Sequence, residues 1–144
     1  MENKRVLGVD YGEARTGIAV SDPTGFMASG VGTIHSRRIE EVVEKIAAYA
    51  ASYGASRIVI GNPINMNGTR GEKSENAARL ADLVRGATGR EVLLYDERCT
   101  TMLAHKILNE TDTRGKKRKN VVDTLAAEII LQNYLDRERG ANRP

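Results

Sequence analysis

Short apolar runs occupy the first 35 residues of the chain, and after them segments with apolar residues at helical spacing alternate with further short apolar runs. Short apolar segments predict strands over residues 5–10, 16–21 and 29–35, and the glycines between the first two favour a hairpin. Apolar residues at helical spacing then predict a helix over residues 38–53, which Gly54 would end.

The second part of the chain alternates strands with helices. The continuous apolar run at 57–60 is typical of a strand covered on both faces. We expect a helix over 72–85, a strand over 91–95, a helix from the Thr100–Thr101 pair to residue 109, a basic loop, and a last helix over 121–137. This order predicts an α/β fold with a mixed five-stranded sheet flanked by helices. It also predicts one domain over residues 1–138 and a C-terminal tail over 139–144.

Composition narrows the class of protein. A single Cys excludes an internal disulfide and fits a reducing compartment. No apolar run is long enough to span a membrane, and the N-terminal residues show no apolar signal segment, so we expect a cytoplasmic protein without a membrane partner. The net charge of +3 is a mild basic bias, compatible with binding to nucleic acid.

Acidic residues follow two of the predicted strands. Asp10 ends the first strand, where a rigid element holds a carboxylate beside a crevice, a setting suited to binding a metal ion or a phosphate. Asp96 and Glu97 follow the fifth strand in the same way. Because side chains alternate along a strand, only one of these two can readily join Asp10, and the other is more simply paired with Arg98.

A third acid, Asp123, lies near the start of the predicted last helix. It falls on the same helical face as five core-type residues, namely Ala126, Ala127, Ile130, Leu131 and Tyr134. Asp123 is therefore either an inward-facing metal ligand or the partner of an N-cap at Asn120. Its convergence with the strand-end acids favours the ligand.

Carboxylates gathered in this way form a hard oxygen site that selects Mg²⁺ or Mn²⁺. Such a site suits in-line hydrolysis of phosphodiester bonds. The basic run RGKKRK at 114–119 lacks aromatic residues and by itself is more typical of a solvated loop, although a loop of this charge can also bind phosphates. The loop over 61–71 follows a buried strand and is expected to line the substrate. The candidate substrate contacts are Arg15, Asn62, Arg70, Lys116, Lys117 and Arg118.

Four segments, in order and over nearly the whole chain, resemble the sequence blocks of the YqgF (RuvX) family. They are GVDYGEARTGIAVSD, GNPINMNGTRGE, YDERCTT and KNVVDTLAAEIILQNYLD. The family is RNase H-like and related to the RuvC Holliday-junction resolvases. The resemblance implies that Asp10, Glu97 and Asp123 are the catalytic and metal-binding acids, which selects Glu97 over Asp96. Cys99 departs from the larger apolar residue that is more frequent in the family, and this affects only local packing.

The resemblance implies a metal-dependent nuclease that uses Mg²⁺ or Mn²⁺ and processes the 5′ end of pre-16S rRNA during ribosome biogenesis. Two alternatives are a Holliday junction resolvase acting on DNA and a non-catalytic, nucleic-acid-binding ribosome assembly factor. The segment DYGEARTG is also similar to the phosphate-binding hairpin of actin-like ATPases, but 144 residues cannot supply the two lobes of those enzymes. The sequence does not decide whether the substrate is RNA or DNA, or whether the protein is a monomer or a homodimer.

Overall fold

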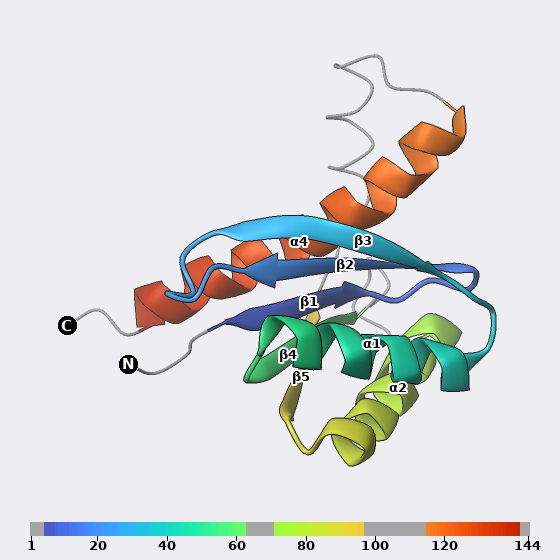
Figure 1. The fold of residues 1–144 in the computed structure, drawn as a ribbon, viewed down its shortest axis with the longest axis horizontal. Coiled ribbons are helices and arrows are strands. Elements are labelled where there is room, and N and C mark those ends of the chain that lie inside the picture. Colours follow the sequence, from blue (N-terminus) through green and yellow to red (C-terminus); the bar gives the residue numbers. More distant parts are fainter. Residues whose placement is uncertain (1–4, 63–70, 97–114, 142–144) are drawn as a thin grey trace.

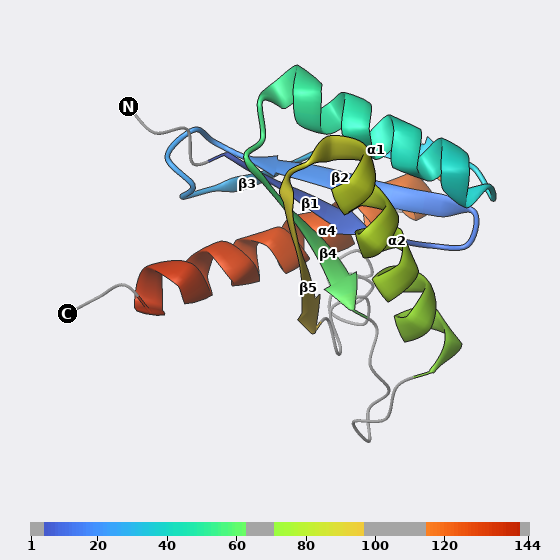
Figure 2. The same ribbon diagram turned by 90° about the horizontal axis from the view of Figure 1, so that it is seen from below.

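The computed structural model describes residues 5–62, 71–96 and 115–141 and forms a sheet with helices on both faces (Figure 1). The five strands are β1 (Val6–Asp10), β2 (Arg15–Ser21), β3 (Ala28–His35), β4 (Arg57–Asn62) and β5 (Glu91–Asp96). Helices α1 (Ile39–Tyr53) and α2 (Glu72–Thr88) cover one face of the sheet, and α4 (Gly115–Ala141) covers the other (Figures 1 and 2).

The sheet is mixed, as predicted, with the strand order β3-β2-β1-β4-β5. Strands β1, β2 and β3 form an antiparallel meander, whereas β4 pairs with β1, and β5 with β4, in parallel. Strands β1, β3, β4 and β5 therefore point the same way and end at one edge of the sheet, called here the carboxyl edge.

Alternating residues of the strands feed two apolar clusters. Leu7, Ile58 and Ile60 are fully buried beneath α1 and α2, while Val6 and Val59 pack beneath α4. Strand β4 is thus apolar on both faces, as its continuous run of Ile and Val predicts. Burial of this kind supplies most of the stabilisation of a helix that lies against a sheet.

Most element boundaries lie within three residues of the predicted ones. Gly54 has φ 65° and its N–H bonds to the carbonyl groups that end α1, which confirms the predicted C-cap. Strand β4 continues through Asn62, and α2 continues to Thr88 before Gly89 ends it. The helix predicted over 100–109 lies outside the described residues. None of the described helices combines the length and the apolar character that a bilayer span requires.

Helix α4 is longer than predicted at both ends. It starts at Gly115, so the basic run from Lys116 onward is helical, and the prediction of a basic loop is wrong there. Lys and Arg are good helix formers and no Pro interrupts the run, so the backbone ladder extends outward from the packed turns. At its other end α4 continues to Ala141 instead of residue 137.

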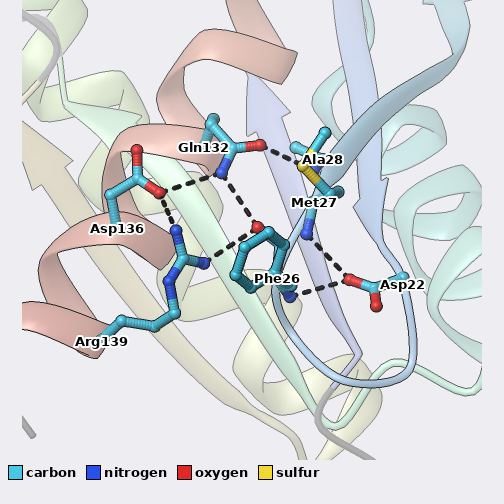
Figure 3. A network of polar contacts seen from close by, with 7 residues as sticks. All are labelled: Asp22, Phe26, Met27, Ala28, Gln132, Asp136 and Arg139. Atoms are coloured by element: carbon cyan, nitrogen blue, oxygen red, sulfur yellow. Dashed lines mark hydrogen bonds and ion pairs between the residues drawn. The ribbon is translucent and has the colours of Figure 1, made fainter.

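A network of polar contacts fastens the β2–β3 turn to the C-terminal half of α4 (Figure 3). The N–H groups of Phe26 and Met27 donate to Asp22 Oδ1 at 2.8 and 2.9 Å, which closes the turn. Gln132 accepts from the Ala28 N–H at 2.9 Å, and both Gln132 and Arg139 donate to the Phe26 carbonyl. The Arg139 guanidinium also lies 4.2 Å from the centre of the Phe26 ring. The contacts of Arg139 hold the part of α4 beyond residue 137 against the β2–β3 turn.

Candidate active site at the carboxyl edge of the sheet

Asp10 is the last residue of β1 and lies half-buried at the carboxyl edge, where it pairs with Gly17 of β2. The even-numbered positions of β1 belong to the face covered by α4, because Val6 packs in the α4 cluster and Gly8 contacts that helix. Val9 packs in the opposite cluster. Asp10 continues the even-numbered series and therefore lies on the α4 face.

Gly8 allows α4 to approach β1 at backbone distance. A Cβ atom built on Gly8 would lie 2.7 Å from Leu131 Cβ and 3.2 Å from the Ala127 carbonyl oxygen, which is too close for any side chain. Residue 123 lies one helical turn before Ala127, and Asp10 lies two residues beyond Gly8. The step from Ala127 back to residue 123 along α4 and the step from Gly8 to Asp10 along β1 each cover about 6–7 Å.

Two contacts on β3 fix the direction of α4 across the sheet. Thr124 contacts Thr33, near the carboxyl edge, with 3.3 Å between the two hydroxyl oxygens. Gln132 bonds to Ala28 at the opposite end of β3. The helix therefore runs from the carboxyl edge toward the opposite edge, and its backbone at position 123 lies on the same face and at the same edge as Asp10.

Gly30 sets how closely this turn of α4 lies on the sheet. A Cβ atom on Gly30 would lie 1.9 Å from Thr124 Cγ2, so the Thr124 methyl group occupies the space that a side chain on β3 would need. With the hydroxyl contact to Thr33, this packing fixes the residue next to Asp123 in the chain.

The structure bears on one of the two interpretations of Asp123. Asn120 lies within α4, five residues after its first residue, so the alternative in which Asn120 is an N-cap does not hold for the described backbone. The apolar stripe is confirmed, since the five core-type residues that follow Asp123 on its face are all buried. The side chain of Asp123 itself is outside the described part of the structure.

The fifth strand presents alternating positions to the two faces of the sheet. Leu93 and Tyr95 pack against the α4 cluster, and Val92 packs in the opposite one. The odd-numbered positions of β5 thus belong to the face that carries Asp10. Asp96 ends β5 beside Asn62, whereas Glu97 lies outside the described residues.

The remaining candidates are placed in part. Asn62 is buried at the end of β4, and Arg15 opens β2 opposite His35; both make contacts with other residues. Arg70 lies outside the described residues, and the three basic candidates at 116–118 are described only as helical backbone. Among the groups whose positions are described, no three His, Cys, Asp or Glu side chains converge on one point.

A cleft of about 820 Å³, which the sequence did not suggest, opens on the other face of the carboxyl edge. It lies between the β1–β2 turn, the start of α1 and the first half of α2. Its polar lining comes from Tyr11, Glu13, Arg37, Arg38, Glu40, Asn76 and Arg79. These residues are distributed over three elements, and the adjacent arginines at 37 and 38 were the one local signal of a basic site.

Comparison with known proteins assigns the chain to a family. Residues 4–137 match the family described as "RuvX: Holliday junction resolvase". Proteins named "Putative pre-16S rRNA nuclease" are similar over most of their length: that of Clostridium botulinum (strain Eklund 17B / Type B) is 45% identical over 133 residues, which are 92% of this chain and 97% of the relative. That of Ruminiclostridium cellulolyticum is 40% identical over 137 residues, which are 94% and 96% of the two chains.

Solved structures show the same fold. Thermus thermophilus RuvC in complex with a Holliday junction substrate has a TM-score of 0.58 at 13% identity, over 94% of this chain and 96% of that one. A Fowlpox virus resolvase bound to Holliday junction DNA has a TM-score of 0.55 at 13% identity, over 93% and 98%. The predicted RNase H-like fold is thereby confirmed. The family model and the relatives both describe nucleases, which are hydrolases of phosphodiester bonds, and this chain belongs to the RuvX family.

Proposed function

We propose that this protein is a metal-dependent nuclease whose active site is formed by Asp10, Glu97 and Asp123, and that it trims the 5′ end of pre-16S rRNA. The observation that carries the proposal is the placement of Asp10. It lies on the α4 face at the carboxyl edge, and the contacts of Gly8 and Thr124 bring the backbone at position 123 to that same edge.

Glu97 is the third acid because of the alternation along β5. Its number continues the odd series of Leu93 and Tyr95, which pack on the face that carries Asp10. Val92, at an even-numbered position of β5, packs on the other face. The alternation along β5 therefore supports Glu97, the residue that the family resemblance implies.

The donor set fits a divalent ion of the Mg²⁺ or Mn²⁺ type, because all three proposed ligands supply carboxylate oxygen. Such an ion, when bound, would activate a water molecule and stabilise the leaving oxygen of the phosphodiester. Asp10 is suited to hold it because β1 is paired on both sides and fixes the carboxylate with little freedom. Arg15, Asn62, Arg70 and the basic first turns of α4 would contact the substrate phosphates.

The proposal is tested with Asp10→Asn, a change that keeps the size of the side chain and removes its charge. We expect cleavage of a labelled RNA carrying the 5′ end of pre-16S rRNA to fall on the order of 10³-fold. Binding of Mn²⁺, measured by calorimetry, should weaken in parallel. Asp82→Asn is the matched control, because Asp82 is an exposed carboxylate on α2, paired with Arg85. Undiminished cleavage by Asp10→Asn in a nuclease-free preparation would refute the assignment.

Cleavage of a four-way DNA junction is the second candidate function. It is favoured by the description of the matched family as Holliday junction resolvases. Labelled RNA and a labelled junction should therefore be tested side by side with the same variants. If the wild type cleaves the junction but not the RNA, and Asp10→Asn loses junction cleavage, the substrate is DNA.

A further inference from the structure

The cleft on the α1/α2 face of the carboxyl edge directly adjoins the candidate active site. Tyr11, which lines the cleft, follows Asp10 in the chain. Asp10 lies on the α4 face, whereas Tyr11 packs against the cluster beneath α1 and α2. A long ligand that reaches Asp10 can therefore pass around the end of β1 and enter this cleft.

The cleft is lined by three arginines and two glutamates, so its lining carries a net positive charge. Among the described residues, the guanidinium groups of Arg38 and Arg79 form no salt bridge. They come from different walls, since Arg38 precedes α1 and Arg79 lies on α2. Arg37 pairs with Glu13 at 3.4 Å, but both side chains are largely exposed, at 72% and 90%, so this pair is weak. The other lining carboxylate is Glu40.

Neutral donors and a helix end complement these cations. Arg38 is the N-cap of α1 and gives no side-chain hydrogen bond to the first turn, so the positive end of the helix faces the cleft without a side-chain cap. The Tyr11 hydroxyl and the Asn76 amide, which also line the cleft, are able to donate hydrogen bonds.

We propose that this cleft binds the phosphodiester backbone of the nucleic-acid strand whose scissile bond lies at Asp10, an inference that rests on the proposed nuclease function. Guanidinium groups on opposing walls match the geometry of phosphate oxygens. The volume of about 820 Å³ is at the upper end of the range for small-molecule sites, which leaves room for more than one nucleotide. Contacts of this type position a strand without reading its sequence.

The test measures binding and not cleavage, so that it is independent of the acids. A fluorescein-labelled stem–loop RNA with a single-stranded 5′ extension is titrated with protein in EDTA, and anisotropy is recorded over a range of salt concentrations. We expect Arg38→Gln and Arg79→Gln each to weaken binding up to about fivefold, the range for exposed ion pairs. Each should also lower the slope of log K against log salt by about 0.7.

Two matched controls accompany these variants. Lys45→Gln removes one positive charge from the exposed side of α1, away from the cleft, and should leave both the affinity and the slope unchanged. Glu40→Gln removes the negative charge from the lining and should tighten binding, whereas Glu44→Gln, outside the cleft, should not. Thermal unfolding of every variant shows that the fold is kept.

The outcomes separate this inference from the proposed function. Wild-type affinity and slope in both arginine variants would overturn the cleft assignment and leave the nuclease proposal intact. Failure of the wild type to bind RNA or a four-way DNA junction would overturn both. The wild type and the two arginine variants are also titrated with AMP, which distinguishes a polymer from a free nucleotide as the ligand. If the arginine variants lose AMP binding but keep wild-type RNA binding, the cleft is not a site for the nucleic-acid backbone.

Discussion

Replacing Gly30 with Ala should displace the turn of α4 that carries Asp123. The added Cβ would lie 1.9 Å from Thr124 Cγ2, whereas carbon atoms in contact are about 3.5–4.0 Å apart. Rotation of the Thr124 side chain away from the new Cβ would break its hydroxyl contact to Thr33. Either α4 moves away from β3 or this contact is lost, and overpacking of this kind costs about 1–3 kcal/mol.

The effect is measured as a shift in melting temperature and as a change in cleavage rate. For a domain of this size about 1 kcal/mol corresponds to about 3 °C, so Gly30→Ala should melt about 3–9 °C below the wild type. If Asp123 belongs to the active site, a displacement of about 1 Å can lower the rate about 10²-fold. Gly86→Ala is the matched control, because a Cβ at that exposed position on α2 would meet nothing within 4 Å. It should stabilise by up to about 1 kcal/mol.

A double-mutant cycle with Thr124→Ser identifies the cause. Serine lacks Cγ2 but keeps the hydroxyl group, and the nearest remaining side-chain carbon of residue 124 would lie 3.3 Å from the new Cβ. Thr124→Ser should therefore recover about 1–2 kcal/mol of the stability lost in Gly30→Ala. Wild-type stability in Gly30→Ala, or strict additivity in the cycle, would refute the reasoning.

Three further predictions concern other parts of the fold. Thr16 is fully buried and its hydroxyl has no partner among the described residues, so Thr16→Val should raise the free energy of unfolding by about 1 kcal/mol in urea titrations, and a loss would contradict this. Hydrogen bonds from the Thr24 hydroxyl and from backbone N–H groups hold the pKa of Asp22 well below its ordinary value. The stability advantage of the wild type over Asp22→Asn should therefore be constant from neutral pH down to about 5 and shrink as the pH falls through and below 3.8, and a pH-independent difference would argue against it. Tyr134 accepts a hydrogen bond from Arg57 at 2.5 Å, so Tyr134→Phe should lower the free energy of unfolding, measured by thermal denaturation, by about 1 kcal/mol. No change would show that Arg57 finds another partner.

The sequence predicted the strands and the inward stripe of α4 because these elements have a strong apolar period. The start of α4 was missed because the residues after Gly115 are all polar, and polar runs carry no period from which a helix can be recognised. The basic run was interpreted as a solvated loop because its charged side chains belong in solvent. A helix that exposes its Lys and Arg side chains leaves them in solvent as well.

The contacts that build the site were beyond prediction for a different reason. Gly8 meets Leu131, and Gly30 meets Thr124, across more than ninety residues of chain. An isolated glycine in a strand indicates a close approach but does not identify the partner. The cleft is similar, because Tyr11, Arg38 and Arg79 come together only when α1 and α2 pack on the sheet.

The placement of α4 has a consequence for how the chain folds during synthesis. The β1–β2–β3 meander is synthesised early, yet its apolar residues Val6, Ala19 and Ala28 are covered by α4, which follows all five strands in the chain. The contact between Ala28 and Gln132 closes a loop of 104 residues. Contacts this distant in sequence slow folding. The nascent sheet therefore keeps one apolar face exposed until α4 has been synthesised, and truncation before Leu135 would remove the contacts of Leu135 and Arg139 that hold α4 on that face.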